Sequence, residues 1–513
     1  MKSVKQIISI SIILAILFSC TQGRNKLKTD EEVLKKEILS QEEQLEQKRS
    51  EREKQLADSL SKLPKGFRFA EERGVDPLHK PMVIDIANSL DSVRTFKLSD
   101  VASNIEYIRM EAVPDSTLLT NMKYKYYLMD NYLIASNLYG IHLFTNDGHF
   151  IRSIVKNEMS GVSYNEKKDR VMYLWSEYME IGGGTNLWAR GNTLFYFYQN
   201  STTGQRYIME YNCSNNESIE TSQFDPENPN QIRGAGKISV DLNYGHTTPP
   251  VKRNRHGAMT MDMQSMYSGM GLFAPDRNTM VHVMRGKNML CISSSQGDTL
   301  AAFTKYEQLK NYTKSLMRGT DHGTSYEKGG DLFFRTDFND TIFQVIPPNR
   351  LLPVYVLNLG QFKLTKQEGV DPGVSLEGKI IPQDFADTKD YLFMTFTKDS
   401  YDCPNSRRSK ELKLYRALFN KINQQLSILT TDPTYYDVPI LKNDIDGGIS
   451  VWPDAYNVGK KGEIWKALTG AELKAHVASD AFKSSNAPIA KKEALKSLAE
   501  KVRDEEQILM IVK

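Results

Sequence analysis

Five methionines between residues 259 and 270 form the densest group of soft metal ligands in the sequence. Met259, Met261 and Met263 alternate along the chain, which would place them on one face of a strand, and His256 lies just before them. Thioether and imidazole groups select Cu(I). Methionine also fills irregular gaps in cores and suits adaptable protein contacts. The segment therefore predicts either a copper site or a flexible packing or binding surface.

Two acidic residues, Asp444 and Asp446, stand directly before a pair of glycines. Their oxygens are the hard ligands that Ca²⁺ prefers, but Lys442 occupies the position where a calcium loop places its first acid. Aspartates in tight turns also accept hydrogen bonds from local backbone amides. We therefore expect either a small ligand site at Asp444 and Asp446 or an ordinary turn.

A short basic segment follows two prolines and contains Arg253 and Arg255. Such a loop can bind an acidic glycan or a lipid head group, or it can simply be solvated. The sequence leaves both readings open.

No linear motif of a hydrolase, a zinc protease, a phosphate-binding loop or a dinucleotide fold occurs in the sequence. The eight histidines are scattered. We expect no cofactor, and the catalytic residues of any activity stay unknown at this stage. An active site built from distant residues is still compatible with this pattern.

The first twenty residues carry the signal for localisation. Lys2 and Lys5 precede a short apolar run, which ends in Leu17-Phe18-Ser19-Cys20 and resembles the signal of bacterial lipoproteins. The run is shorter than the roughly 20 residues that a membrane-spanning helix needs. Residues 1–19 are thus expected to be removed and Cys20 to carry lipid such as palmitate, with more than one acyl chain and hence a stable membrane anchor.

Thr21 follows Cys20, where lipoproteins retained at the inner membrane in some related bacteria have an aspartate. This favours an anchor in the outer membrane of the cell envelope. Whether the protein faces the periplasm or the cell surface stays open.

Three further cysteines, Cys213, Cys291 and Cys403, lie far apart without CxxC spacing. At most one disulfide can form among them, and neither a zinc site nor a disulfide framework is indicated.

Composition allows a large folded body. The 513 residues are 40% hydrophobic and 25% charged, with a formal net charge of +3. The near-neutral balance and the lack of a basic block argue against nucleic acid as a partner.

Residues 20–66 are predicted to form a lipidated N-terminus and a helical stalk. From residue 30 to 62 the chain is mostly Glu, Lys, Gln, Ser and Leu, and Thr29 with Glu32 makes a capping box. Pro64 and Gly66 end the pattern. The apolar positions are sparse for a coiled coil, so a solvated single helix is favoured, although pairing with another chain stays open.

Residues 67–513 are predicted to be all-β. Short apolar runs alternate with polar turns, as in the hairpins expected over 127–136 and 141–155, and comparable pairs recur along the chain. A helix is expected over 490–504 and a last strand over 507–512. Repeated four-stranded units favour a six-bladed β-propeller over a sandwich.

Several segments resemble the six-bladed β-propeller lipoproteins of Bacteroidetes, a family of uncharacterised function. They are Phe96 to Val101 with Ile105 to Ile108, the turn at residues 144–148, and Asn443 to Gly448 with Trp452-Pro453. The resemblance covers roughly residues 90–513 and implies architecture only. The Gly-Pro-Gly-Glu-Tyr turn common in that family is replaced here by residues 156–164, so a ligand role of that turn is not carried over.

Together these features predict a membrane-anchored extracytoplasmic lipoprotein whose propeller is a non-enzymatic binding module or scaffold for a protein, peptide or glycan. The alternative is a hydrolase or lyase that acts on a polysaccharide in the propeller channel. An enzyme should gather carboxylates or histidines at the channel, whereas a binding module needs only aromatic and backbone contacts.

Overall fold

The computed structural model describes Glu51, Lys54 and most of residues 80–513. The gaps are at 114–124, 138–139, 157–158, 166–169, 176–186, 200–205, 215–235, 242–251, 254–258, 261–270, 274–278, 284–287, 295–298, 305–322, 371–372, 402–411, 430–439, 455–457 and 460. The chain divides into two compact units, Met1–Leu63 and Pro64–Lys513.

In the first unit, Glu51 and Lys54 are helical. The predicted signal, the lipidated Cys20 and the rest of the predicted stalk lie outside the described residues. None of the described helices is long and apolar enough to span a membrane.

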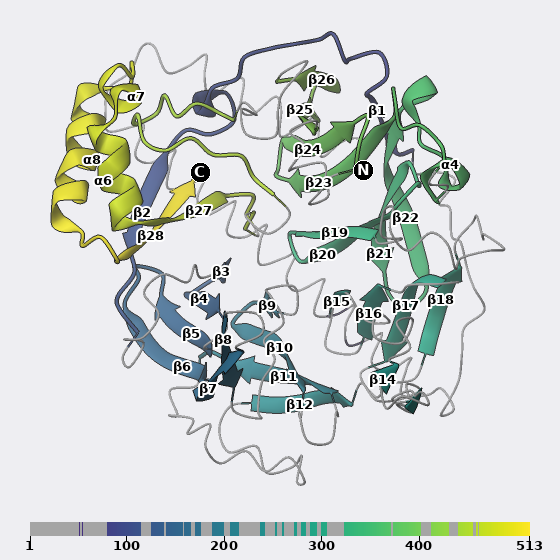
Figure 1. Cartoon of the computed structure of the whole chain (residues 1–513), viewed down its shortest axis with the longest axis horizontal. Coiled ribbons are helices and arrows are strands. Elements are labelled where there is room, and N and C mark those ends of the chain that lie inside the picture. Colours follow the sequence, from purple (N-terminus) through teal and green to yellow (C-terminus); the bar gives the residue numbers. More distant parts are fainter. Residues whose placement is uncertain are drawn as a thin grey trace. The chain divides into compact units, whose positions relative to one another are not determined.

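The second unit is built mainly from antiparallel sheets that follow one another around a common centre in a propeller-like arrangement (Figure 1). Four of its sheets have four strands each. They are β3 (Lys125–Leu128), β4 (Tyr132–Asn137), β5 (Gly140–Thr145) and β6 (Phe150–Lys156); β9 (Leu187–Arg190), β10 (Thr193–Gln199), β11 (Arg206–Asn212) and β12 (Gly236–Asp241); β15 (Gly271–Phe273), β16 (Thr279–Val283), β17 (Asn288–Ser294) and β18 (Thr299–Thr304); and β23 (Ile380–Asp387), β24 (Tyr391–Lys398), β25 (Lys413–Asn420) and β26 (Gln425–Ile428).

Two further sheets combine segments from distant parts of the chain. A five-stranded sheet contains, in spatial order, β1 (Met82–Asp85), β22 (Arg350–Asn358), β21 (Thr341–Ile346), β20 (Asp331–Thr336) and β19 (Gly323–Lys328). In this sheet β1 pairs in parallel with β22. A three-stranded sheet sets β2 (Ile105–Arg109) against β28 (Gln507–Val512) and β27 (Ile464–Thr469). The last sheet therefore joins the start of the folded unit to its end, which closes the ring of sheets.

The remaining described elements lie outside the six larger sheets. They are the strand pairs β7 (Met159–Asn165) with β8 (Arg170–Trp175) and β13 (Lys252–Arg253) with β14 (Met259–Thr260), the 3₁₀ helices η1 (Leu98–Asp100) and η5 (Gly360–Phe362), and the helices α4 (Lys366–Val370), α6 (Gly470–Ala478), α7 (Asp480–Lys483) and α8 (Ile489–Lys501).

Neighbouring sheets pack face to face, because each of four hydrophobic clusters draws its residues from two adjacent sheets. In β24, for example, Met394 faces the cluster shared with β19–β22, and the adjacent Phe393 faces the cluster shared with β27 and β28. In β4, Leu133 and Ile134 divide in the same way between two clusters. A strand alternates its side chains between its two faces. Both faces of these sheets are thus buried, as radial packing of blades requires.

The hairpins predicted over 127–136 and 141–155 are confirmed as β3–β4 and β5–β6, and the predicted C-terminal helix and strand are confirmed as α8 and β28. The all-β class and the propeller-like arrangement also hold. Four of the described sheets have the four strands of a standard blade, so the number of six blades stays a prediction.

Candidate functional site

A cavity lies where the inner edges of four sheets meet. Its lining residues come from β3, β9, β19 with the following turn, and β27 with the segment that leads into it: Tyr126, Tyr127, Leu128, Ala189, Glu327, Gly329, Gly330, Val458, Gly459 and Trp465. Each of these strands is the edge strand of its sheet and lies near the centre of the ring (Figure 1). The cavity is thus an axial feature that no single sheet could form.

The cavity is small. The centres of water molecules can occupy about 50 Å³ of it, which is room for roughly three to five waters. It cannot enclose a drug-sized ligand, since such pockets have volumes of roughly 300–1,000 Å³. It can accept the tip of a larger ligand, such as one side chain or one exocyclic group.

The cavity wall is largely aromatic and backbone. Tyr126 meets Trp465 edge to face, with ring centroids 6.0 Å apart, and both side chains are nearly buried. Among the described lining residues, Glu327 is the one acid. Gly329 and Gly330 occupy the turn between β19 and β20 with positive φ angles of 58° and 81°, a conformation that favours glycine. Tyr126 and Trp465 therefore shape the wall from behind, whereas the partly exposed Tyr127 and the backbone of the glycine turn can offer stacking and hydrogen bonds to a ligand.

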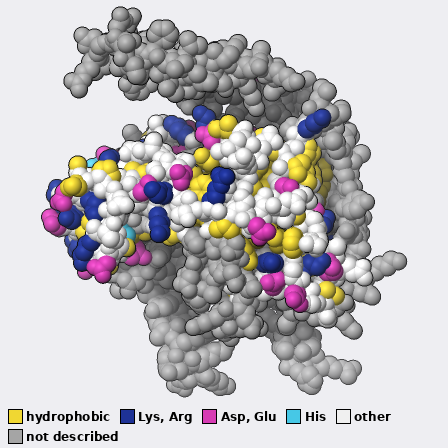
Figure 2. All heavy atoms as spheres, turned by 90° about the horizontal axis from the view of Figure 1, so that it is seen from above, with side chains coloured by type: hydrophobic (Ala, Val, Ile, Leu, Met, Phe, Trp, Pro, Cys, Tyr) yellow, Lys and Arg dark blue, Asp and Glu magenta, His cyan; other side chains and the backbone are white. Residues whose placement is uncertain are grey.

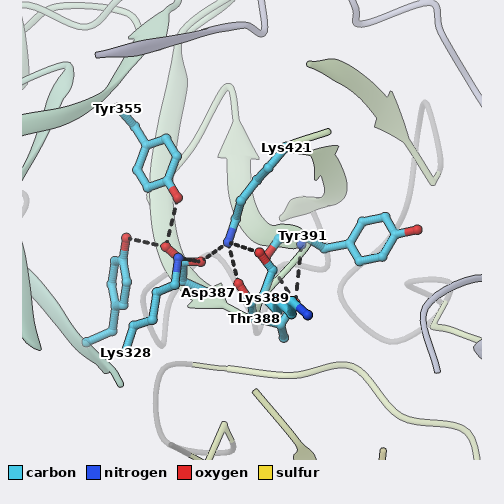
Figure 3. A network of polar contacts seen from close by, with 8 residues as sticks. Lys328, Tyr355, Asp387, Thr388, Lys389, Tyr391 and Lys421 are labelled. Atoms are coloured by element: carbon cyan, nitrogen blue, oxygen red, sulfur yellow. Dashed lines mark hydrogen bonds and ion pairs between the residues drawn. The ribbon is translucent and has the colours of Figure 1, made fainter. Parts of the chain in front are cut away.

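Behind the β19 wall lies a buried network centred on Asp387, the last residue of β23 (Figure 3). The Asp387 side chain is fully buried. Its carboxylate accepts from the Tyr355 hydroxyl at 2.9 Å and the Tyr326 hydroxyl at 3.4 Å, and it pairs with the Lys328 ammonium at 3.0 Å. Lys421 approaches the same carboxylate from the other side. Figure 3 shows that Lys328, Lys421 and Tyr355 all point at Asp387.

The Lys421 ammonium is held by oxygen acceptors on several sides. It donates to the Asp387 carboxylate, to the Thr388 carbonyl and, at 3.3 Å, to the Lys389 carbonyl. Three N–H groups thus face three acceptors, which is the full donor capacity of an ammonium. Lys421 lies in the turn after β25, and its acceptors lie at and just after the end of β23.

Burial and charge act against each other at Lys421. Burial, together with the nearby Lys328 ammonium, lowers the pKa of Lys421 to about 8, although the Asp387 carboxylate opposes the change. Burial raises the pKa of both tyrosines, Tyr326 and Tyr355, and the negative charge of Asp387 adds to the increase. The tyrosines are therefore hydrogen-bond donors throughout the physiological range.

The Asp387 and Lys421 side chains of this network cannot reach a substrate as they stand. The Asp387 carboxylate has no exposed surface, and the Lys421 side chain is only 9% exposed. General acid–base catalysis requires a group within hydrogen-bond reach of the reacting atom. The network therefore has the geometry of a connection between two sheets.

The predicted ligand residues Asp444 and Asp446 are engaged by different donors of the chain. Asp444 accepts from the Ser99 amide at 3.0 Å and the Ser99 hydroxyl at 2.6 Å. Burial raises the pKa of Asp444, but these two bonds hold it below its ordinary value. Asp446 is buried and accepts from the Asn443 amide at 2.7 Å and the Gly448 amide at 2.8 Å. Asp444 thus accepts hydrogen bonds from the 3₁₀ helix η1, and Asp446 accepts hydrogen bonds within its own turn.

The predicted basic and methionine sites share one short hairpin. Backbone pairing of β13 with β14 sets Arg253 opposite Met259. Arg255, His256, Met261 and Met263 lie outside the described residues, as does Cys20. In the described part of the chain, no group of three or more His, Cys, Asp or Glu residues is placed to hold a metal ion.

Two of the cysteines, the buried Cys213 and the partly exposed Cys291, do not form a disulfide with each other. Burial raises the pKa of Cys213 to about 12, although Arg152 lowers it in part. The Cys213 thiol is therefore protonated and inert at neutral pH. Cys403 lies outside the described residues.

Charges on the surface are mixed. Figure 2 shows lysine and arginine side chains interspersed with acidic ones over the described part of the upper face, including its helical end. No single-sign patch covers that part, which agrees with the net charge of +3.

Sequence reasoning did not predict the axial cavity or the Asp387 network. Lys328 and Lys421 stand in polar turns, in the runs Glu-Lys-Gly-Gly and Asn-Lys-Ile-Asn. Such runs are typical of solvated loops. Nothing in the sequence singles out Asp387, because its strand also contains the polar residues Gln383 and Asp384.

Comparison with known families gives one match over most of the chain. Residues 64–479 match the family described as Domain of unknown function (DUF4933). The chain belongs to this family. Its members share a domain whose activity the family description does not state, so the description adds no substrate or partner.

Solved structures with some similarity include two from Bacteroides. A protein of Bacteroides fragilis described as a candidate exported protein is 12% identical, with a TM-score of 0.45, over 84% of this chain and 99% of that one. A protein of unknown function from Bacteroides caccae is 9% identical, with a TM-score of 0.27, over 58% of this chain and 79% of that one. Among the curated proteins, nothing matches the chain.

Proposed function

We propose that the chain is a lipid-anchored protein of the cell envelope whose propeller binds a protein, peptide or glycan partner at the axial cavity, without chemistry of its own. The observation that carries this proposal is the convergence of four sheets on one small aromatic cavity. A cavity of this size accepts the tip of a partner, while the surrounding loops contact the rest of it.

The distribution of acids supports binding over catalysis. Glycoside hydrolysis commonly uses two carboxylates about 5–9.5 Å apart across the scissile bond. The described lining of the cavity contains one acid, Glu327, and the neighbouring Asp387 is sealed behind the wall. The polysaccharide-active hydrolase or lyase is therefore the weaker alternative.

We also propose that the six larger sheets are six blades of one propeller. Four have the usual four strands, one has a fifth strand added by β1, and the last is closed by β2 and β28. Four shared hydrophobic clusters link five of these sheets in sequence, which supports radial packing. The two-stranded pairs β7–β8 and β13–β14 are then insertions between blades.

The location in the envelope, with an outer-membrane lipid anchor, rests on the Cys20 signal and the threonine that follows it. An anchored binding propeller needs a partner that is reachable from the membrane surface, so envelope proteins, peptides and glycans are the expected partners. Nucleic acid is not.

The test compares ligand stabilisation in matched variants of the full chain. Ala189→Leu fills the cavity, whereas Ala471→Leu makes the same substitution at an exposed position of α6. A ligand at 100 times its Kd should add about 2.7 kcal/mol to the folded state, or a Tm increase of roughly 3 °C for a body of about 450 residues. We expect oligosaccharides or short peptides from a panel to give this increase in the wild type and in Ala471→Leu only.

Two outcomes would contradict the proposal. An increase of the same size in Ala189→Leu would place the ligand outside the cavity. Release of shortened oligosaccharides during incubation would favour the enzymatic alternative.

A further inference from the structure

The Asp387 network joins two neighbouring sheets. Tyr326 and Lys328 belong to β19 and Tyr355 to β22 of one sheet, whereas Asp387 ends β23 and Lys421 follows β25 of the next. These donors and one acceptor form a polar end to the hydrophobic cluster that the two sheets share. Separation of the sheets would expose the cluster and break the three bonds that reach Asp387 from the other sheet, those of Tyr326, Tyr355 and Lys328. Lys421 lies in the same sheet as Asp387, so its charge acts on these three bonds through the carboxylate that it shares with Lys328.

The network holds unequal charge. Two ammonium groups, Lys328 and Lys421, share one carboxylate, and both pair with the same oxygen of Asp387. One positive charge is therefore in excess in a place with little water. Like charges that share a buried site titrate together, and one of them loses its proton more readily than a free side chain does.

We propose that this network is a proton-controlled clasp between the two sheets, loose when both lysines are charged and tight when Lys421 has lost its proton. In this step the Lys421 ammonium gives one proton to solvent and becomes an amine. The remaining pair, Lys328 and Asp387, is balanced. The amine keeps two N–H donors for Asp387 and the Thr388 carbonyl, and the longer bond to the Lys389 carbonyl is released.

The other charged groups near Lys421 lie in exposed or partly exposed turns. Lys389 and Asp390 follow Asp387, and the Lys421 amide bonds the Asp390 carbonyl. Lys461 and Glu463 lie in the turn that packs on Thr388 through Gly462, and Glu463 accepts from the Lys461 amide. Two acids and two bases balance one another there, and solvent screens them. The buried Lys421, the partly exposed Lys328 and Asp387 therefore set the titration.

The direction of the effect follows from proton binding. A free lysine in the unfolded chain titrates near 10.4, whereas burial lowers the pKa of Lys421 to about 8. Between these values the unfolded chain binds more protons than the folded one, so stability rises with pH. The clasp tightens as the pH moves from about 7 to about 9.5.

The experiment follows the lysine ammonium groups of the wild-type chain by ¹⁵N NMR and its urea midpoint from pH 7 to 9.5. We expect one lysine to titrate between about pH 7.5 and 9, and the midpoint to rise over the same range. Lys421→Met and Lys421→Arg fix the charge at zero or one, so both should lose this rise. Lys496→Met, at an exposed position of α8, should keep it.

Two results would overturn the proposal. One is titration of every lysine above about pH 10 in the wild type, which needs no variant to fold. The other is an equal rise of the midpoint in the wild type and in Lys421→Met.

Discussion

Replacing Asp387 by asparagine tests whether the network holds the two sheets together. The substitution keeps the shape of the side chain and removes its charge. Lys421 then loses its counter-charge in a site where its side chain is 9% exposed, and Lys328 loses its pair at 3.0 Å. Removal of one partner of a buried ion pair costs about 3–5 kcal/mol, because the other charge stays buried.

The magnitude agrees with a direct electrostatic argument. Two unit charges 3.0 Å apart, as for Lys328 and Asp387, attract by about 5 kcal/mol at an effective dielectric constant of 20. Solvent weakens this value because Lys328 is 33% exposed. The more buried Lys421 adds to the loss, so the range of about 3–5 kcal/mol is reasonable.

Urea denaturation of the full chain measures the effect. The midpoint should fall with an unchanged slope if the folded and unfolded states are otherwise the same. Asp504→Asn is the matched control, since it breaks an exposed pair with Lys474 at 2.6 Å; exposed pairs contribute about 0–1 kcal/mol.

A second variant separates the charge from the shape. Asp387→Asn with Lys421→Met removes both members of the most buried pair, so it should lose less than Asp387→Asn alone. The coupling between the two sites is expected to be about 1–3 kcal/mol. Additive losses in the double variant, or a loss below about 1 kcal/mol in Asp387→Asn, would refute the reasoning that buried charge holds these sheets.

Two further predictions concern the closure of the ring and the membrane anchor. Gly148→Ala should destabilise the fold by roughly 2 kcal/mol or more, since Gly148 has φ +92° and an added Cβ would lie 2.1 Å from the Arg109 carbonyl oxygen. The control Gly329→Ala, at a position with φ +58° and nothing within 4 Å of an added Cβ, should cost only about 1–2 kcal/mol. Equal losses of stability in the two variants, measured by urea denaturation, would contradict the close approach of Gly148 to Arg109. Cys20→Ala should abolish incorporation of labelled palmitate and release the chain from the membrane fraction. The control Cys213→Ala should keep both palmitate incorporation and membrane association. Membrane association of Cys20→Ala would argue against the lipid anchor.

Local turn chemistry explains why parts of the fold could be predicted. Asn146-Asp147-Gly148 between two apolar runs predicts the β5–β6 hairpin, and Gly148 adopts the positive φ that such turns favour. The helical pattern before the last apolar run likewise predicts α8 and β28. These elements depend on neighbours in the sequence.

Elements that depend on distant partners were not predictable in the same way. The parallel pairing of β1 with β22 joins residues more than 250 positions apart, as between Val83 and Val356. The axial cavity needs four sheets, and the Asp387 network needs turns that look solvated in the sequence. Burial of Lys421 arises only after two sheets pack, so its lowered pKa has no local signature.

The acidic pair that is most conspicuous in the sequence acts in the closure of the ring. The backbones of Lys97 and Lys442 form an isolated parallel β-bridge. Ser99, two residues later, donates hydrogen bonds from its amide and its hydroxyl to the Asp444 carboxylate. The chain then continues into β2, which pairs with β28. Asp444 therefore fixes the N-terminal segment where it enters the last sheet. A ligand at Asp444 would therefore have to displace the bonds from Ser99 that hold this segment, and a ligand at Asp446 would have to displace the bonds from Asn443 and Gly448 within its own turn. The described lining of the axial cavity includes neither carboxylate, so a ligand there leaves these bonds intact.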